Sequence, residues 1–368
     1  MDLTRFLLAW RTVAVRDREV IDALVDPAHA GPSAELRAAL NAWPGSWYWS
    51  DEDGYRHLVL TRPRRAARRE NWLLHVGLFL ATLVTTSWAG ATFAGALPAS
   101  PLFGLPAGIE SPGDFLRALG AGMVFSVPLL SILLAHELGH YLTARRYDLD
   151  ASPPYFIPLP LPSLVGTMGA FIRLRTIVTD RRQLVDVAGA GPIAGFLVAL
   201  PVLWAGLARS APVAGFDGML LWVGGERFEL GDSLITVALR TLVWGEVTGL
   251  AVHPLAFAGW VGMFVTMLNL LPIAQLDGGH ILFAALPRWK ERVALAFLGV
   301  ILVLGWYSAW PGWWVFGLFV LVLSRGRLGH PPVIDVYRPL PRARRWLAWT
   351  ALALFLVTFT PVPFRIVS

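Results

Sequence analysis

The chain has 368 residues, of which 55% are hydrophobic and only 15% are charged, and its formal net charge is +6. An average soluble domain carries about 25% charged residues, so this composition excludes an ordinary water-soluble globule. Cysteine is absent, which excludes disulfides, cysteine-ligated zinc and cysteine nucleophiles. The basic excess comes almost entirely from arginine and indicates contact with a lipid bilayer at cytoplasmic loops, with no nucleic-acid partner.

Residues 1–70 differ from the rest of the chain and are predicted to form a small soluble cytoplasmic region. Ser33 is a plausible N-cap for a helix, and Asp53-Gly54 predicts a turn between two strands. The predicted elements are two short amphipathic helices followed by the two strands, in the order 11–25, 33–43 and 46–62. No chemistry is indicated in this region, for which packing or regulation is the default role.

Residues 71–368 are predicted to form an all-α polytopic membrane domain with about seven transmembrane helices. A short re-entrant β segment is predicted in addition. Crossing a hydrocarbon core takes about 20 apolar residues. Long runs contain no Asp, Glu, Lys or Arg: 71–109, 187–208, 247–276, 293–324 and 346–364. A shorter run at 118–135 continues into a further span. Trp310-Pro311-Gly312 predicts a turn that divides the fourth of these runs into two spans.

The arginines predict the orientation of the spans. Five arginines in "RPRRAARREN" precede the first span and place the N-terminus in the cytoplasm. The connection 96–114 has no Lys or Arg, and 208–250 is acidic on balance, so both are expected outside. Whether 230–245 dips back into the membrane is left open. We expect a multi-pass protein of a bacterial inner membrane.

His136-Glu137-Leu138-Gly139-His140 places three ionisable side chains inside the second predicted span. Residues four apart share one helix face, so both imidazoles can bind one cation. In a zinc hydrolase the metal lowers the pKa of a bound water, and a glutamate such as Glu137 takes its proton. The pattern also arises by chance in soluble proteins, where it has no chemical role. Inside a membrane such side chains cost several kcal/mol and therefore indicate function.

A third protein ligand is needed if two histidines are to hold a metal with one open position for water. Asp277 is the best candidate, because it follows an apolar run and precedes Gly278-Gly279, which permit a tight break. Asn269 is a second polar residue on the same span, and Pro272 opens the helix after it. The alternative is that Asp277 only caps a helix that opens at Gly278.

These motifs together resemble the site-2 proteases, intramembrane zinc metalloproteases of peptidase family M50. The family pattern is HExxH on one helix and, later, Asn-x-x-Pro before an LDG aspartate; here these are HELGH, "NLLP" at 269–272 and "LDG" at 276–278. "GTMGAFIRLR" and "DVAGAGPIAGF" are similar to a branch without a PDZ domain that includes plant chloroplast and cyanobacterial members. The resemblance covers most of 115–363, with a catalytic core at about 115–285, and leaves 1–70 uncovered.

The resemblance implies that one Zn²⁺ per chain is bound by His136, His140 and Asp277, with Glu137 as the general base. Asn269 would position the substrate or stabilise the oxyanion. The implied reaction is hydrolysis of peptide bonds in membrane-protein substrates, single spans or tail segments, within or next to the bilayer. The oligomeric state and the physiological substrate are not indicated.

Residues 166–174, "GTMGAFIRL", alternate small and apolar side chains and are poorly suited to a membrane helix. They predict a re-entrant strand whose free edge pairs with an unwound segment of the substrate. Its predicted substrate-binding residues are Gly166, Gly169, Ala170 and Phe171. An ordinary cytoplasmic hairpin is the alternative.

Two other functions fit part of this pattern. A prenyl-protein type membrane metalloprotease would need a glutamate as third ligand, and no suitable intramembrane glutamate follows Glu137. A membrane metal transporter or metal-binding scaffold could use the same His/Asp cluster. A transporter would more often show several acidic or histidine residues along one path, and the glutamate beside the ligands favours hydrolysis.

Overall fold

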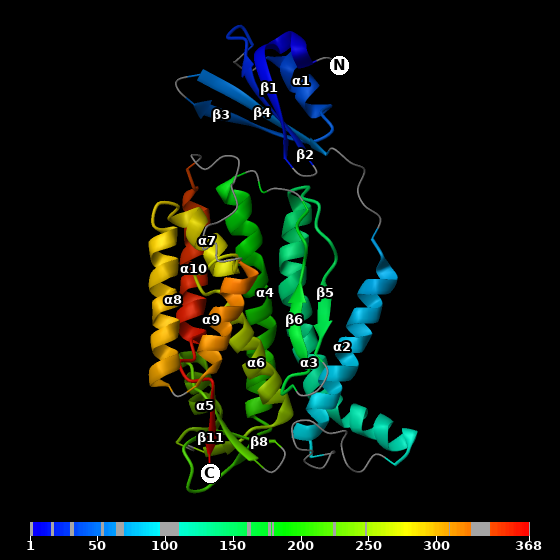
Figure 1. Ribbon diagram of the computed structural model, residues 1–368, viewed down its shortest axis with the longest axis vertical. Helices are drawn as coiled ribbons and strands as arrows, with labels where there is room; N and C mark the ends of the chain where they lie inside the picture. Colours follow the sequence, from blue (N-terminus) through cyan, green and yellow to red (C-terminus); the bar gives the residue numbers. More distant parts are fainter. Residues whose placement is uncertain are drawn as a thin grey trace.

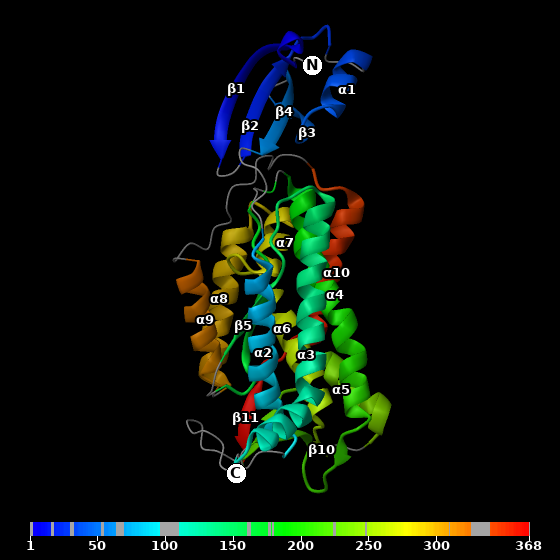
Figure 2. The ribbon, with the colours of Figure 1, turned by 90° about the vertical axis from the view of Figure 1, so that its right-hand side faces the viewer.

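The computed structural model describes most of the chain, in these ranges: 3–15, 18–29, 33–52, 55–63, 70–95, 110–159, 163–175, 178, 180–223, 226–246, 249–308, 310–324 and 339–367. A small β domain lies at one end of the long axis, above a bundle of helices (Figures 1 and 2). A second sheet lies at the other end of the bundle, where the chain ends. We call these two ends of the bundle the N-domain end and the sheet end.

The N-terminal domain is a four-stranded sheet in the order β1-β2-β4-β3, with one helix packed on it. Its elements are η1 (Leu3–Phe6), β1 (Leu7–Val15), β2 (Arg18–Val25), α1 (Ala34–Asn41), β3 (Ser46–Glu52) and β4 (Tyr55–Pro63). The predicted helix at 33–43 and the two strands at 46–62 are confirmed. The Ser33 hydroxyl accepts a hydrogen bond from the Leu36 backbone N–H at 3.3 Å. The predicted turn at Asp53-Gly54 lies outside the described residues.

The predicted helix over 11–25 is wrong, because this segment forms the antiparallel pair β1 and β2. Val20, Ile21 and Val25 are β-branched, and such side chains lose less rotamer freedom on a pleated surface than in a helix. β2 also pairs with β4, so its backbone hydrogen bonds are satisfied on both edges. These long-range pairings outweigh the weak helical periodicity of the segment.

Polar contacts join the N-terminal domain to the bundle. Arg18 is buried, and its guanidinium donates to the backbone carbonyl of Asp148 at 2.9 Å. Arg175 donates to the Glu70 carboxylate at 3.0 Å, and this hydrogen bond holds the Glu70 pKa below its ordinary value. The first contact holds the segment between α3 and the hairpin described below, and the second holds the segment that follows this hairpin.

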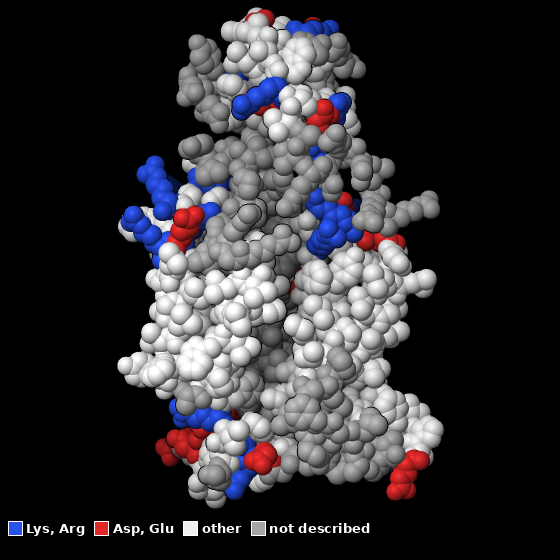
Figure 3. Space-filling model, viewed as in Figure 1, with Lys and Arg blue, Asp and Glu red and all other residues white. Residues whose placement is uncertain are grey.

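The bundle consists of α2 (Trp72–Phe93), α3 (Pro112–Arg146), α4 (Arg181–Leu207), α5 (Leu234–Trp244), α6 (Pro254–Asn269), α7 (Asp277–Ala285), α8 (Lys290–Tyr307), α9 (Gly312–Leu323) and α10 (Arg342–Thr358). Within the described ranges, three helices are long and apolar enough to cross a membrane, namely α2, α3 and α4. A band of uncharged side chains crosses the middle of the visible face, with charged residues above and below it (Figure 3). The molecule is therefore a mostly helical, multi-pass membrane protein.

The expected boundaries hold for most helices but not for all. The turn predicted at Trp310-Pro311-Gly312 separates α8 from α9. The uncharged run at 247–276 contains a shorter helix than expected, because α6 ends at Asn269. The residues of the expected outer loop at 96–109 and the arginines at 64–69 lie outside the described residues.

The membrane domain is not all-α, because two sheets accompany the helices. β7 (Ala211–Pro212), β8 (Gly218–Val223), β9 (Glu226–Leu230), β10 (Gly249–Ala251) and β11 (Phe364–Val367) form a sheet in the order β11-β9-β8-β10-β7. Its strands bring the C-terminus beside the segment 208–250, as expected for two segments on one side of a membrane. Residues 230–245, left open above, contribute the 11-residue helix α5, which lies at the sheet end of the bundle (Figure 1).

A second, two-stranded sheet consists of β5 (Tyr155–Pro158) and β6 (Thr167–Phe171). The hairpin lies alongside α2 and α3 rather than beyond their ends (Figures 1 and 2). This position matches the predicted re-entrant strand better than a cytoplasmic hairpin.

Glycines set the spacing between the central helices. A Cβ on Gly122 of α3 would lie 1.7 Å from the backbone oxygen of Ser87 on α2, and a Cβ on Gly139 would lie 2.5 Å from that of Ala190 on α4. Small residues allow helices in a membrane to approach closely, where packing and not the hydrophobic effect drives association. Glycines of α3 therefore let this helix pack closely against both α2 and α4.

The contact at Gly122 predicts the effect of a single methyl group. Gly122→Ala should lower the thermal stability of the detergent-purified protein by about 1–3 kcal/mol, the usual cost of overpacking. Gly120→Ala is the matched control, because nothing lies within 4 Å of a Cβ at Gly120 on the same helix. Equal melting temperatures for the two variants would show that α2 and α3 do not pack in this way.

Candidate active site

The HELGH residues lie in the last third of α3, on a helix surrounded by other helices. Relative exposure is 4% for His136, 6% for Glu137 and 7% for His140. Burial at this level requires polar partners, because an unpaired polar group in an apolar interior costs several kcal/mol. The partners come from α4, from the last residue of α6 and from the first turn of α7.

Asp277 reaches the histidines because the chain reverses sharply after Asn269. Ala274 in this turn has a positive φ of 51°, and α7 begins at Asp277 itself. A Cβ on Gly278 would lie 1.9 Å from the Leu270 backbone oxygen, so the reversal requires glycine there. The N-cap position is Leu276, which makes no side-chain cap. The carboxylate of Asp277 is therefore not used as a helix cap.

Three side-chain atoms from α3 and α7 form a nearly equilateral triangle. The Nε2 atoms of His136 and His140 are 3.1 Å apart, and an Asp277 carboxylate oxygen lies 3.3 Å from each of them. Around a tetrahedral zinc with bonds of about 2.0–2.1 Å, neighbouring ligand atoms stand roughly 3.3–3.4 Å apart. The triangle therefore has the size of one face of a zinc coordination tetrahedron.

The second nitrogen of His140 fixes the state of its ring. Nδ1 lies 2.7 Å from the backbone carbonyl of Val187 on α4. A carbonyl oxygen only accepts, so Nδ1 carries a proton and the lone pair of the neutral ring is on Nε2. Metal-binding histidines usually have such a partner, which orients the ring and increases its basicity.

Two glycines of α4 leave room for the imidazole rings. A Cβ on Gly191 would lie 2.1 Å from His140 Nε2, and one on Gly195 would lie 3.2 Å from His136. This part of the glycine-rich segment of α4 therefore faces the histidines. The donor set, its spacing and this space together fit one zinc ion.

Glu137 and Asn269 lie next to the residues of the triangle. The Glu137 carboxylate lies within hydrogen-bonding reach of the Ile172 backbone amide, one residue after β6. The Asn269 side-chain nitrogen lies 3.2 Å from His136 Nε2. The structure therefore brings together all five residues that the sequence suggested for catalysis and metal binding.

The predicted substrate-binding residues lie along β6 and at its start. Gly166 has a φ of 77°, and its backbone oxygen accepts a hydrogen bond from the Thr85 hydroxyl of α2 at 2.7 Å. Gly169 has a φ of 100° with open space at its Cβ position. Ala170 is half-buried, while Phe171 is 46% exposed. In the part of the chain that the structure describes, β6 pairs only with β5, so its other edge is unpaired.

Sequence patterns do not indicate the groups that support these residues. Arg344 of α10 donates to Asp186 of α4 at 3.0 Å, and the Tyr147 hydroxyl after α3 donates to the same carboxylate. Asp186 precedes Val187, so this cluster joins three helices next to the carbonyl that holds His140. An arginine and an aspartate 158 positions apart form no local motif. A backbone carbonyl is present in every residue, so its role cannot be identified from the type of residue.

Fold and site together define a multi-pass membrane protein with a buried two-histidine, one-aspartate centre of the kind that binds zinc. Residues 124–305 match the model described as Peptidase family M50. The chain therefore contains a domain of Peptidase family M50, the family of the site-2 proteases, as the sequence motifs predicted.

Curated relatives agree with this assignment. The chain is 32% identical over 252 residues to the probable zinc metalloprotease EGY1, chloroplastic, of Arabidopsis thaliana, covering 66% of this chain and 43% of that protein. It is 26% identical over 325 residues to the probable zinc metalloprotease EGY2, chloroplastic, of the same plant, covering 85% of this chain and 55% of that protein. The chain thus spans about half the length of these relatives. No solved structure matches significantly.

The space at Gly191 predicts how sensitive the metal site is to one methyl group. Gly191→Ala should lower zinc affinity by roughly 10–100-fold, the range for changes in groups that support metal ligands. Zinc content is measured by atomic emission after dialysis against graded chelator. Gly195→Ala, one turn along α4, should retain most of the zinc because its Cβ meets His136 only at 3.2 Å. Unchanged zinc affinity in Gly191→Ala would contradict the described packing of His140.

Proposed function

We propose that this protein is an intramembrane zinc metalloendopeptidase that hydrolyses peptide bonds of membrane-protein substrates. The observation that carries the proposal is the triangle of His136, His140 and Asp277 with a buried glutamate beside it. A site built only for structure would have no need of Glu137, which sits next to the ligands without being one. The family assignment and the names of the relatives support the same activity.

The roles of the residues follow from their positions. Zinc, when bound, would supply Lewis-acid activation of water and of the scissile carbonyl. His136, His140 and Asp277 would hold it, with His140 oriented by the Val187 carbonyl. Glu137 would take the proton of the attacking water and deliver it to the leaving amine. The Asn269 amide, next to His136, would donate a hydrogen bond to substrate or to the developing oxyanion.

Seven helices are proposed to cross the bilayer: α2, α3, α4, α6, α8, α9 and α10. All of them lie between the N-domain end and the sheet end (Figures 1 and 2), and among the described residues α2, α3 and α4 have the length and composition of a full span on their own. The arginines of the sequence gather at the N-domain end, which supports a cytoplasmic N-terminus. The relatives are named chloroplastic, and a bacterial inner membrane remains our proposal for this chain. Residues 1–70 are proposed to be a separate cytoplasmic region.

The unpaired edge of β6 is proposed to bind the substrate. A peptide bond in a helix hides its carbonyl in its own hydrogen bonds, so the substrate must unwind before cleavage. Strand addition supplies replacement hydrogen bonds to the unwound segment. Ile172, directly after β6, reaches Glu137, so a segment paired along 166–171 would lead to the site. Figure 3 shows a hollow down the middle of the uncharged band, on the face where Figure 1 shows β6.

Metal transport is the weaker alternative for this site. A transport path needs successive binding positions, and such residues would lie along the bundle. Within the residues that the structure describes, His136, His140 and Asp277 form the one group of three or more that could hold a metal ion. A single closed group beside a glutamate favours hydrolysis.

Two substitutions separate catalysis from metal binding. Glu137→Gln should keep its zinc but cleave a single-span substrate at least about 100-fold more slowly, since general acid–base catalysis contributes roughly 10²–10⁴-fold. Asp277→Ala should lose both zinc and cleavage, because two histidines alone hold the metal poorly. The measurements are zinc content and cleavage of the same substrate in reconstituted liposomes.

Either result can go against the proposal. Wild-type cleavage by Glu137→Gln would remove the general base from the mechanism. Full zinc occupancy in Asp277→Ala would show that another group completes the site.

The absence of cysteine allows a direct test of the substrate strand. Met168→Cys and Phe171→Cys replace side chains that are 55% and 46% exposed. In the Glu137→Gln background, each should form a disulfide with a cysteine placed near the cleavage site of a bound substrate. Val300→Cys is the matched control, because its side chain is 48% exposed on α8, which lies across the bundle from β6 (Figure 1). Equal disulfide yields at 300 and at the β6 positions would argue against strand addition.

A further inference from the structure

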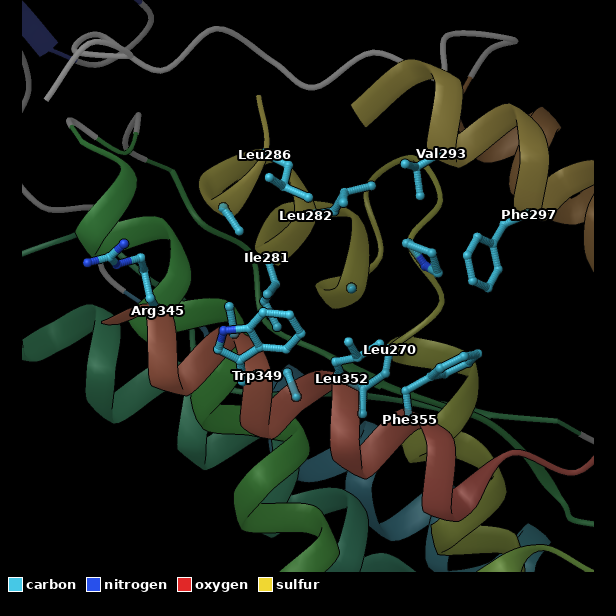
Figure 4. A pocket seen from close by; sticks show the side chains of 15 residues that line it. Leu270, Ile281, Leu282, Leu286, Val293, Phe297, Arg345, Trp349, Leu352 and Phe355 are labelled. Atoms are coloured by element: carbon cyan, nitrogen blue, oxygen red, sulfur yellow. The ribbon is translucent and has the colours of Figure 1, made fainter. Parts of the chain in front are cut away.

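A cavity of about 330 Å³ lies between α7, α8 and α10 at the N-domain end of the bundle. Its wall is apolar except for Arg345, the one charged residue among those that line it. Figure 4 shows Arg345 at one end of the cavity and Phe297 and Phe355 at the opposite end. The cavity is therefore cationic at one end and aromatic at the other.

The lining residues of α10 form one stripe along that helix. Arg345, Trp349, Leu352 and Phe355 are spaced by four, three and three residues, which places them on a single helix face. At 1.5 Å per residue the stripe is roughly 15 Å long. This length is about half the 30 Å hydrocarbon core of a bilayer. The cavity thus runs from the level of the lipid headgroups to the bilayer midplane.

The stripe is open toward the outside of the bundle. Trp349 is 62% exposed and Leu352 is 43% exposed, so the cavity is accessible from the surrounding lipid. Arg345 is exposed and forms no ion pair with any residue that the structure describes, whereas its neighbour Arg344 is held by Asp186. The opening therefore offers an available guanidinium at headgroup level.

We propose that this cavity binds one acyl chain of an anionic phospholipid, with the lipid phosphate on Arg345 and the chain extending toward Phe355. Basic pockets between transmembrane helices on the cytoplasmic side are recognised by anionic headgroups. A guanidinium binds phosphate oxygens in a bidentate fashion, and a tryptophan such as Trp349 favours the membrane interface. Along α10 the cavity has its charged group at one end and apolar groups at the other. A phospholipid in one leaflet has its headgroup and acyl chain in the same order.

The bound chain would also support the metal site. The wall opposite α10 includes Gly278, Ile281 and Leu282 of α7, the helix that begins at Asp277. An acyl chain in the cavity would pack against this helix and limit its movement away from the histidines. The lipid site rests on the proposed membrane placement, but it requires neither zinc nor proteolysis.

The test uses the full-length protein in a non-ionic detergent, with dioleoylphosphatidylglycerol and dioleoylphosphatidylcholine as probes. Native mass spectrometry should show one retained phosphatidylglycerol, preferred over phosphatidylcholine by roughly fivefold, the factor expected for one arginine at an anionic headgroup. Arg345→Gln should reduce this preference to near parity. Ala348→Phe fills the cavity and should abolish retention of both lipids. Phosphatidylglycerol should raise the melting temperature of the wild type but not of Ala348→Phe.

Two control variants make the same changes of charge and of bulk at positions outside the cavity. Arg146→Gln removes an exposed charge from the same end of the bundle, and Ala353→Phe adds a ring to an exposed position of α10 outside the cavity. Both should retain phosphatidylglycerol like the wild type.

Several results would overturn the proposal. Equal retention of the two lipids by the wild type would exclude recognition of an anionic headgroup. Wild-type retention by Ala348→Phe would place the lipid elsewhere. If Ala348→Phe instead abolished self-association or substrate cross-linking and left lipid retention unchanged, the cavity would belong to a second copy or to the substrate. Because these readouts do not depend on cleavage, an inactive but lipid-binding protein would refute only the proposed protease function.

Discussion

The structure depends on the placement of three ionisable side chains at one point inside an apolar bundle. His136 and His140 lie on α3 and Asp277 lies on α7, and His140 and Asp277 are 137 positions apart in the sequence. In a low-dielectric interior each would be costly alone. Their nitrogen and oxygen atoms converge within 3.1–3.3 Å, as the ligands of one cation do. The sharp reversal after Asn269, the glycines of α4 and the partner of His140 can all be understood as means of holding this arrangement.

Glycine has a specific mechanical role in that arrangement. Gly191 gives the His140 ring its space, Gly278 allows the chain to turn back past Leu270, and Gly122 and Gly139 bring three helices together. In water, hydrophobic burial could compensate for looser contacts. In a bilayer the lipid is as apolar as the protein, so the helices depend on close packing. The same close packing leaves a metal-sized space at the centre of the bundle.

Positioning also extends outward from the centre. Asp186 binds Arg344 and Tyr147, next to the carbonyl that orients His140, and so couples α10 to the ends of α3 and α4. Arg175 binds Glu70 a few residues after β6, and Ile172, between β6 and Arg175, contacts Glu137. The proposed lipid cavity lies against α7, which holds Asp277. The site is thus supported from the N-terminal domain end, where Arg18 also contacts the segment after α3.

The sequence by itself determined the membrane location, the order of most helices and the residues of the centre, because burying charge is costly and apolar runs and HELGH are local patterns. It misjudged 11–25 as helix and the outer segments as lacking a sheet, since strand pairing with β4 or β11 is settled by residues far along the chain. Only the tertiary structure decided three contacts. Asp277 lies beside both histidines, the Val187 carbonyl orients the His140 ring, and Arg345 lies at one end of an apolar cavity. These are relations between distant segments, and packing creates them.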